Sequence, residues 1–546
     1  MATLTKPPDR LRLPLLDDYL REQQALTAVE RFARAADARP SVPAERHYRA
    51  PLPATPPGEG QQYAFEVDLD VCSGCKACVT ACHNLNGLDE GETWRAVGLL
   101  HGGTAAAPVR QTVSTACHHC LDPACMSGCP VGAYEKDSIT GIVKHLDDQC
   151  IGCQYCTFTC PYEVPQYNAK RGIVRKCDMC SGRLAAGEAP ACVQACPNSA
   201  IAITVIDKRQ ALEDAQGDAF LPGAPSPAIT VPTTIYRSER PPPRNLLPAD
   251  FFRIAPAHRH VPLVVMLVLT QLSVGTFVLE AIASRFFTAE LRAALAPAWS
   301  LAALSIGLCA LGASVFHLGR PLYAFRAVIG LRTSWMSREI VAFGGFAVLA
   351  MVYAGSSLVD LPRALPPWLA QLREPLGWLV AGLGVLGVAC SVAIYHATRK
   401  AWWTATTTGF KFFGTAALLG LATARVILAF ADVELPSAMP ALAGLVITVS
   451  LVKAAGELAL FLHLRDKRYT ELRRSAVLMI RDLRRWTFAR YATLAVGGVV
   501  LPALDQGGSP RAAAIASCAL LLAGELLERT LFFAAVSSHR MPGAIR

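Results

Sequence analysis

CIGCQYCTFTCP, from Cys150 to Pro161, decides the fold of the first half of this 546-residue chain. Its spacing is C-x2-C-x2-C-x3-C-P. Three closely spaced thiolates on a tight loop can hold three corners of one iron–sulfur cube. The fourth Cys, three residues further on, points away and ligates a second cluster. The stretch therefore predicts a domain that holds its iron–sulfur clusters in pairs.

Three further sets of four cysteines surround this stretch, so residues 1–255 hold sixteen of the nineteen cysteines in the chain. The four sets are Cys72, Cys75, Cys78 and Cys82; Cys117, Cys120, Cys125 and Cys129; Cys150, Cys153, Cys156 and Cys160; and Cys177, Cys180, Cys192 and Cys196. Zinc sites usually combine separate C-x2-4-C pairs, and disulfide scaffolds belong to secreted chains. Soft thiolates in these runs favour iron–sulfur clusters over both alternatives.

Crossed ligation turns four sets into four [4Fe–4S] clusters. The simplest pairing is nested, first set with fourth and second with third, because the second and third sets are inserted between the outer two. The expected ligand groups are Cys72, Cys75, Cys78 and Cys196; Cys82, Cys177, Cys180 and Cys192; Cys117, Cys120, Cys125 and Cys160; and Cys129, Cys150, Cys153 and Cys156. Four clusters in one chain indicate an electron relay, with no substrate chemistry on this chain.

Short β-prone stretches separate the cysteine sets: Tyr63–Val67, Gly141–His145 and Ala200–Val205. They predict the small hairpins of an α+β doubled bacterial ferredoxin-like domain over residues 61–216. The Pro-rich residues 217–257 are expected to be an extended linker to the second half of the chain.

Residues 1–60 are expected to form an N-terminal arm. Within it, Leu13–Ala36 has apolar residues at helical spacing, which predicts an amphipathic helix. Such a helix could pack on a partner subunit or cover the core of its own domain, and the sequence does not separate the two.

Residues 258–546 carry nearly all the long apolar runs of a chain that is 52% hydrophobic. Runs of bilayer length predict an all-α membrane bundle of about eight transmembrane helices. The expected spans are 261–283, 297–317, 339–358, 376–396, 405–430, 439–462, 487–504 and 512–536. The single Cys309, Cys390 and Cys518 in these spans are expected to be packing residues.

An even number of spans places both termini on one side of the membrane. The loops and tail on that side carry 16 Lys and Arg, against five in the loops on the other side. The positive-inside rule then predicts that the iron–sulfur domain lies on the cytoplasmic side of a bacterial inner membrane. The first residues show no secretory or twin-arginine signal, which points the same way. The basic face could instead serve the docking of a partner.

His317, His396 and His463 all stand at span ends on the iron–sulfur side. A pair of stacked b-type haems across the bilayer would need axial histidines at both depths, so no haem is expected. A lipid-soluble quinone is the expected electron partner within the membrane.

The cysteine sets CSGCKACVTAC, CHHCLDPACMSGCP, CIGCQYCTFTCP and CDMC…CVQACP resemble the iron–sulfur subunit of the dimethyl sulfoxide reductase family over residues 61–205. Residues 258–540 resemble the membrane anchor of that family. The motifs that carry this resemblance are FHLGRP at Phe316–Pro321, SWMSREI at Ser334–Ile340 and GELLERTLFF at Gly524–Phe533. In the family these are usually two separate polypeptides, and here they look fused.

The resemblance implies a separate catalytic subunit with a molybdenum bis-pterin guanine dinucleotide cofactor. It also implies that the cluster of Cys72 lies nearest the molybdenum and the cluster of Cys129 nearest the quinone. The histidine of the anchor motif is implicated in quinone binding, which maps to His317. The weaker candidates nearby are Arg320, Arg338 and Glu339. The nitrate reductase relative has Trp where this chain has Cys153, so no [3Fe–4S] centre is expected.

The predicted cytoplasmic location of the iron–sulfur domain distinguishes between two possible functions. A quinone-linked sulfite dehydrogenase has this architecture on the cytoplasmic side, which makes oxidation of sulfite to sulfate the leading hypothesis. The alternative is the quinol-oxidising subunit of an exported dimethyl sulfoxide or polysulfide reductase. A third hypothesis, of another class, is a proton-translocating or transport protein with sensor clusters, built on the intramembrane residues Glu280, Lys411, Lys453, Glu457 and Glu525. No nucleic-acid partner is expected.

Overall fold

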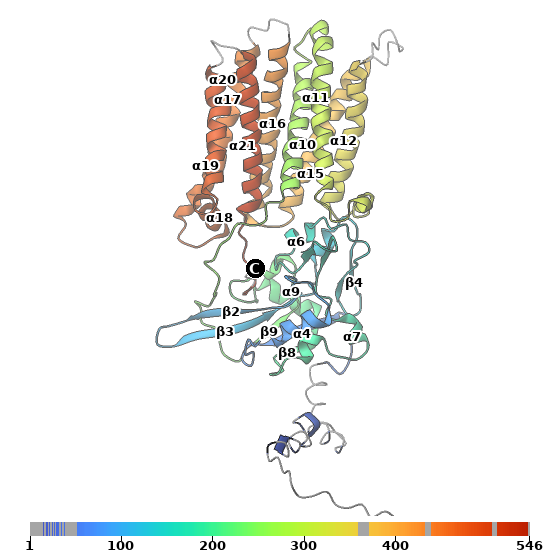
Figure 1. Cartoon of the computed structure of the whole chain (residues 1–546), viewed down its shortest axis with the longest axis vertical. Coiled ribbons are helices and arrows are strands. Elements are labelled where there is room, and N and C mark those ends of the chain that lie inside the picture. The colour runs from blue at the N-terminus through green and yellow to red at the C-terminus, as the bar shows by residue number, and fades with distance from the viewer. Residues whose placement is uncertain are drawn as a thin grey trace, which may run out of the picture.

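The computed structural model describes residues 52–358, 371–431, 438–504 and 510–543, with a few single positions between 15 and 38. A small α+β domain lies against one end of a bundle of long helices (Figure 1). The predicted amphipathic helix over Leu13–Ala36 falls mostly outside the described residues.

The α+β domain is made of short elements placed between the cysteine sets. Its elements are β1 (Gln61–Asp68), α4 (Ala77–Leu85), β2 (Ala96–Gly103), β3 (Pro108–Thr115), α5 (Ala124–Ser127), β4 (Tyr134–Lys136), β5 (Val143–His145), α6 (Tyr155–Thr159), β6 (Gln166–Asn168), β7 (Ile173–Arg175), α7 (Ser181–Ala185), α8 (Ala191–Gln194), β8 (Ile201–Asp207) and α9 (Lys208–Gln216). The ferredoxin-like α+β class predicted from the sequence is confirmed.

β1 and β8 explain why the outer cysteine sets meet. They pair antiparallel from Gln61 opposite Asp207 to Val67 opposite Ile201. The first set follows β1 directly and the fourth set precedes β8, so this pairing brings the two sets to the same end of one sheet. Two smaller hairpins, β4–β5 and β6–β7, flank the third set.

The segment expected as a linker adds strands to both larger sheets. β9 (Ile235–Arg237) pairs parallel with β1, which completes the order β8-β1-β9. β10 (Leu247–Pro248) pairs antiparallel with β2 and joins the β2–β3 hairpin. The segment therefore lies along the α+β domain before it reaches the bundle.

The second half is an all-helical bundle whose bounds follow the predicted spans. Its elements are α10 (Val261–Ala283), α11 (Ala289–Val315), η2 (Pro321–Val328), α12 (Trp335–Leu358), α15 (Arg373–His396), η3 (Ala401–Trp403), α16 (Ala405–Phe430), α17 (Ala438–Leu458), η4 (Ala459–Arg465), α18 (Glu471–Ile480), α19 (Arg484–Ala495), a π-turn at Val496–Val500, α20 (Leu501–Leu504) and α21 (Pro510–Ala534).

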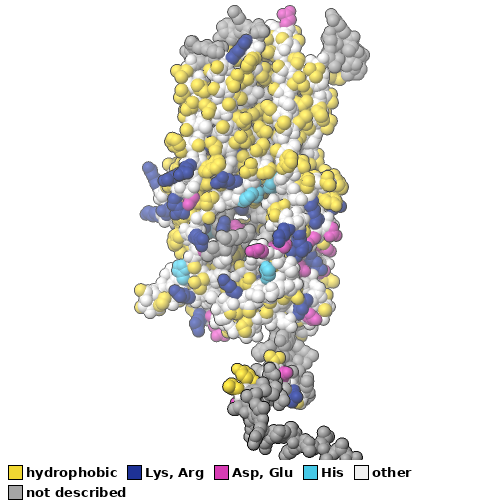
Figure 2. Space-filling view, in the orientation of Figure 1, with side chains coloured by type: hydrophobic (Ala, Val, Ile, Leu, Met, Phe, Trp, Pro, Cys, Tyr) yellow, Lys and Arg dark blue, Asp and Glu magenta, His cyan; other side chains and the backbone are white. Residues whose placement is uncertain are grey.

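Seven helices of the described residues are long and apolar enough to cross a membrane. The eighth long helix that the sequence predicts, α21, runs through the same bundle (Figure 1) and buries Glu525, Glu528 and Arg529. On the face shown in Figure 2, apolar side chains cover the bundle, and Lys and Arg side chains gather where the bundle meets the α+β domain. This distribution is that of a multi-pass membrane protein.

Candidate functional site

The cysteine loops turn their backbone N–H groups toward sulfur. Left-handed residues shape the loops, including Lys76 at φ 64° and Gln154 at φ 60°. The N–H donors that reach sulfur are Ala133 to Cys129 (3.3 Å), Gly152 to Cys150 (3.4 Å), Met179 to Cys177 (3.4 Å) and Ala200 to Cys196 (3.3 Å). Such N–H groups stabilise thiolate ligands and tune cluster potentials.

The first and fourth sets lie together. Burial and the neighbouring thiols of Cys192 and Cys180 raise the pKa of the Cys82 thiol to about 12. Burial also raises the pKa of Cys78, helped by the thiols of Cys192 and Cys196. These shared contributions show that thiols of the first and fourth sets lie near one another, as a pair of clusters held between the two sets requires.

The second and third sets lie together in the same manner. Burial raises the pKa of Cys160 to about 11, with Cys117 as a neighbouring thiol that adds to the effect. Burial raises the pKa of Cys153 to about 12, and the thiols of Cys129 and Cys150 add to it. The second set therefore lies beside the third, and the assignment of each cysteine to one ligand group stays a prediction.

One thiol connects the two pairs. Burial raises the pKa of Cys177, and the next contributions come from Cys117 and then Cys82. Cys177 and Cys82 belong to one expected ligand group and Cys117 to another. The two groups therefore adjoin, as a continuous relay requires. All nineteen cysteines are free of disulfide bonds.

Two buried cations lie among these thiols, and sequence reasoning missed both. The Lys176 side chain is 3% exposed, and its ammonium lies 3.7 Å from the Cys117 sulfur. Burial lowers its pKa, but the thiols of Cys117 and Cys125 outweigh burial and leave the pKa raised. Arg95 donates to Ser114 Oγ at 3.0 Å, and that hydroxyl lies 3.7 Å from Cys78 Sγ.

These cations fit an iron–sulfur site, since a cluster with four thiolates carries net negative charge and needs nearby compensation in a buried setting. Lys176 directly precedes a ligand cysteine in the sequence, which is a weak signal. Arg95 gives no sequence signal, because only the fold brings the start of β2 to the first and fourth sets.

The third cysteine loop packs against the bundle through glycine residues, so that backbone meets backbone. A Cβ at Gly152 of this loop would lie 2.9 Å from Gly319 Cα, in the turn after α11. Gly319 also packs against Gly172 of the β6–β7 turn, where a Cβ at Gly319 would lie 2.2 Å from the Gly172 carbonyl oxygen. The adjacent Arg320 donates its backbone N–H to Ile151 O at 3.0 Å and Nη1 to Asp147 O at 2.8 Å. The FHLGRP motif thus holds the loop of Cys150 and Cys153 against the membrane domain.

His317 faces the same loop. Its imidazole interacts with the backbone of Cys153, and burial lowers its pKa below the usual value. Its ring lies 5.4 Å from His260, measured between ring centroids. Burial, then the charges of His317 and His258, lower the pKa of His260 to about 3. Two imidazoles whose pKa values are below the usual value for histidine therefore lie between the third cysteine loop and the bundle.

The other quinone candidates are distributed around this point. Glu339 of α12 is buried and accepts a hydrogen bond from Ser391 of α15. Nearby, Tyr155 of α6 donates to Ile394 O at 2.7 Å. Arg338 instead donates to the carbonyls of the 331–332 loop, and its guanidinium stacks 4.3 Å over the Trp335 ring. Arg320 therefore binds across the junction of the two domains, and Arg338 holds a loop of its own helical half.

An aromatic cluster at this junction was not singled out from the sequence. It consists of Phe158, Tyr395, Trp403, Phe532 and Phe533. Phe158 contacts His260 at 4.9 Å between ring centroids and Trp403 at 5.6 Å. Flat apolar rings beside a buried imidazole suit the planar head of a quinone.

Ionisable residues form a buried network in the half of the bundle nearer the α+β domain. The members are Lys411, Lys453, Glu457, Arg490, Glu525, Glu528 and Arg529. Arg490 Nη2 lies 2.7 Å from Glu457 Oε1 and 2.9 Å from Glu525 Oε1, and Lys453 pairs with the second oxygen of Glu525. Mutual pairing makes such burial tolerable in a membrane. Sequence reasoning named four members and missed Arg490, Glu528 and Arg529.

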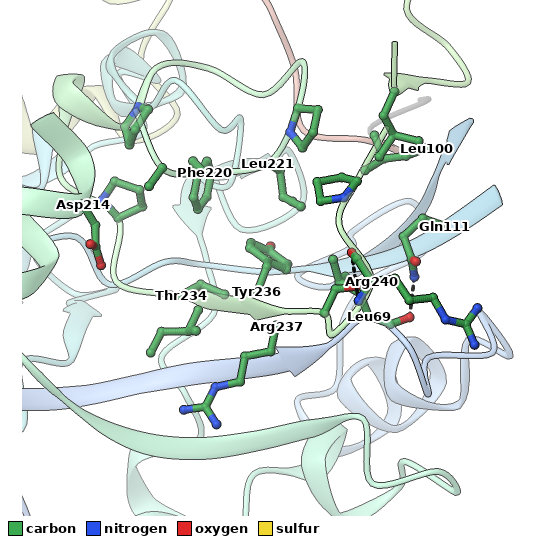
Figure 3. Close-up of a pocket in the computed structure, with 18 of the residues that line it drawn as sticks. Leu69, Leu100, Gln111, Asp214, Phe220, Leu221, Thr234, Tyr236, Arg237 and Arg240 are labelled. Atoms are coloured by element: carbon green, nitrogen blue, oxygen red, sulfur yellow. Dashed lines mark hydrogen bonds between the residues drawn. The ribbon is translucent and has the colours of Figure 1, made fainter. Parts of the chain in front are cut away.

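A cavity of about 820 Å³ opens in the α+β domain between β8, β9, α9 and the 219–246 segment (Figure 3). Its walls include Phe220, Leu221 and Tyr236, with Asp214 and Arg237 at its edge. None of the lining residues is a cysteine, so the cavity is separate from the cluster loops.

Two family models match the chain. The model of the 4Fe-4S dicluster domain matches residues 109–206. The model of the DMSO reductase anchor subunit (DmsC) matches residues 256–535, which is just over half of the chain.

Curated relatives match the iron–sulfur half. The B subunit of anaerobic dimethyl sulfoxide reductase from Haemophilus influenzae is 35% identical over 189 residues, 33% of this chain and 91% of the relative. The subunit of the same name from Escherichia coli is 36% identical over 189 residues, 32% of this chain and 88% of the relative. The thiosulfate reductase electron transfer subunit PhsB of Salmonella typhi is 38% identical over 152 residues, 27% of this chain and 79% of the relative.

Proposed function

Because the chain belongs to the family of dimethyl sulfoxide reductase-type subunits, with iron–sulfur protein and anchor fused in one polypeptide, we propose that it carries electrons between membrane quinone and a separate molybdenum-containing catalytic subunit. The observation that carries this proposal is the contact between the third cysteine loop and the His317 turn. It joins the proposed last cluster group to the membrane domain at the half-buried His317.

The sixteen cysteines are proposed to hold four [4Fe–4S] clusters, which supply one-electron carriers when bound. Cys129, Cys150, Cys153 and Cys156 form the group next to the bundle. Cys75, in the group of Cys72, Cys78 and Cys196, is exposed. This exposed group is the proposed contact with the catalytic subunit, which is expected to carry a molybdenum bis-pterin guanine dinucleotide. Arg95 and Lys176 are proposed to offset the negative charge of the thiolates within this series of clusters.

The quinone site is proposed at the junction, with His317 as its main polar residue. Quinone reduction takes up two electrons and two protons, so the head group needs hydrogen-bonding partners that can exchange protons. A neutral imidazole can donate a hydrogen bond to a quinone oxygen or accept one from a quinol. Glu339 is the proposed buried carboxyl that exchanges protons with this region, while Arg320 and Arg338 position the loops.

The side of the membrane is proposed from charge. The loops on the side of the α+β domain carry 16 Lys and Arg against five on the other side, and the dark band in Figure 2 lies at that junction. By the positive-inside rule the iron–sulfur domain faces the cytoplasm. On that side we propose sulfite:quinone oxidoreduction, with electrons flowing from sulfite to quinone.

A reductase working in the opposite direction is the second candidate. The relatives named above favour it, because they belong to dimethyl sulfoxide and thiosulfate reductases. In that case quinol would be oxidised at the same junction. The family membership favours both electron-transfer candidates over a sensor or transport protein.

Two measurements separate the candidates. In the first, a reporter that is active only in the cytoplasm is fused after Arg546. It should show activity if the proposed side is correct. The complex purified from native membranes should then reduce quinone with sulfite as donor. A periplasmic reporter, or quinol oxidation by a sulfoxide or thiosulfate without any sulfite activity, would establish the reductase instead.

A further inference from the structure

The bundle has a second polar site at the end away from the α+β domain. A cavity of about 470 Å³ opens there, where α10 ends, α11 begins, α12 ends and α15 begins. Its polar lining includes Glu280, Ser284, Arg292, Tyr353, Arg373 and Trp378. Because helix ends mark the depth at which a bilayer becomes polar, this cavity lies at the level of lipid head groups of the opposite leaflet.

A buried carboxylate forms the floor of this cavity. Glu280 is 7% exposed, and Tyr353 donates to its Oε1 at 3.0 Å. Oε2 has no hydrogen-bond partner among the described residues. A buried carboxylate oxygen without a donor is costly, and in a membrane an ionisable residue of this kind marks a functional site by default. Glu280 Oε2 therefore remains open to a further hydrogen-bond donor within the cavity, and a cationic donor would fit best.

Arginines form the opposite half of the site. Arg373 stacks 5.3 Å over the Tyr353 ring, and its buried Nη2 has no partner within the described part of the chain. Arg292 lines the same cavity. At the rim, Arg285 and Glu374 pair at 3.0 Å, so Glu374 is already neutralised by a cation. The buried Arg373 Nη2 therefore calls for an anionic acceptor, and the exposed Arg292 can add a second positive charge beside it.

One ligand class supplies both groups at this depth. We propose that the cavity binds the head group of a primary-amine phospholipid, with the ammonium on Glu280 and the phosphate on Arg373 and Arg292. Choline head groups have no N–H to donate to Oε2. Glycerol head groups carry no cation, and a quinol has no charge to match the arginines. Ile282 of α10 and Leu379 and Leu386 of α15 are exposed apolar side chains on two of the helices that line the cavity, and they offer surface for the acyl chains.

The test uses the whole complex with native mass spectrometry. The complex is reconstituted with equal amounts of ethanolamine, choline and glycerol phospholipids, then stripped with detergent, and the retained lipids are counted. The unaltered protein should retain ethanolamine lipid over choline lipid by about tenfold, the size of effect that one charge-assisted hydrogen bond supports. This comparison needs no variant.

The matched variants assign the selectivity to the cavity. Glu280→Gln should abolish the preference for ethanolamine lipid, and Arg373→Gln should lower total lipid retention. Glu290→Gln is the control, because Glu290 is an exposed carboxylate on the same face that does not line the cavity. Equal retention of ethanolamine and choline lipid by the unaltered protein would overturn the proposal. An unchanged preference for ethanolamine lipid in Glu280→Gln would also overturn it. So would a retained molecule with the mass of a quinone in place of a phospholipid, if Glu280→Gln removes it.

Discussion

Gly319 and Gly172 touch backbone to backbone at the junction of the two domains, close enough that a Cβ on Gly319 would lie 2.2 Å from the Gly172 carbonyl oxygen. No side chain can enter this contact without moving one domain. The rate of electron transfer falls steeply with distance, so we expect this contact to set how well the proposed last cluster group exchanges electrons with a quinone at the site proposed beside His317.

Gly319→Val should therefore uncouple the quinone from the clusters. The added side chain pushes away the β6–β7 turn at Gly172, and with it the adjoining Gly152 in the loop of Cys150 and Cys153, while the cysteines and their N–H donors remain intact. Quinone-linked turnover should fall by tenfold or more, and the cluster content measured by electron paramagnetic resonance should stay unchanged. Gly312→Val is the control, because nothing lies within 4 Å of a Cβ at Gly312 in α11. Equal loss in both variants would contradict this role of the contact.

His317→Ala should remove the main polar partner of the quinone head group. Turnover with quinone should drop by about tenfold to a hundredfold, the range of a lost general acid–base group, while electron transfer to a soluble dye at the clusters should persist. His463→Ala serves as comparison, since His463 is partly exposed and pairs with Asp466 at 2.9 Å. Unchanged quinone kinetics in His317→Ala would place the quinone elsewhere.

Lys176→Gln should lower the reduction potential of the nearest cluster. Reduction adds negative charge, and the buried ammonium 3.7 Å from Cys117 Sγ stabilises that charge. Loss of one buried cation should shift the potential down by an amount on the order of tens of millivolts. A redox titration followed by electron paramagnetic resonance measures it. Lys170→Gln, on the exposed surface beside Asp89, should leave all potentials unchanged, and a rise in Lys176→Gln would refute the assignment.

Lys453→Met should destabilise the bundle, because it leaves Glu525 and Glu457 with less positive charge in a buried network. Breaking one partner of a buried ion pair costs about 3–5 kcal/mol. The thermal midpoint in detergent should fall clearly, and Lys453→Met combined with Glu525→Gln should recover part of the loss. Arg481→Gln, an exposed arginine paired with Asp482, should have little effect. A double variant less stable than Lys453→Met would argue against pairing.

Local patterns predict much of this molecule. The spacing of cysteines such as Cys150, Cys153 and Cys156 predicts the domain class, since cluster ligation dictates a tight loop. The helix bounds Val261–Ala283 and Ala405–Phe430 coincide with the predicted spans, because the bilayer sets the length of an apolar run. His317 could be singled out because it stands in a short motif at the end of a span.

Features that depend on distant pairing could not be predicted. β9 and β10 are three and two residues long, too short for any periodicity to appear, and they form only because β1 and β2 offer free edges. Arg490 and Arg529 resemble ordinary basic residues near helix ends until the bundle brings them to the carboxylates of other helices. The same holds for Arg95, whose neighbouring thiol Cys192 lies much further along the chain.

The four-cluster relay is tested most directly by electron paramagnetic resonance and metal analysis of the purified chain with its partners, in a stepwise reductive titration. Four distinct [4Fe–4S] signals without a [3Fe–4S] signal are expected, and Cys153→Ser should alter one of them, the cluster next to the membrane domain, and leave the other three. Fewer than four clusters, or zinc bound in stoichiometric amounts at these cysteines, would contradict the relay.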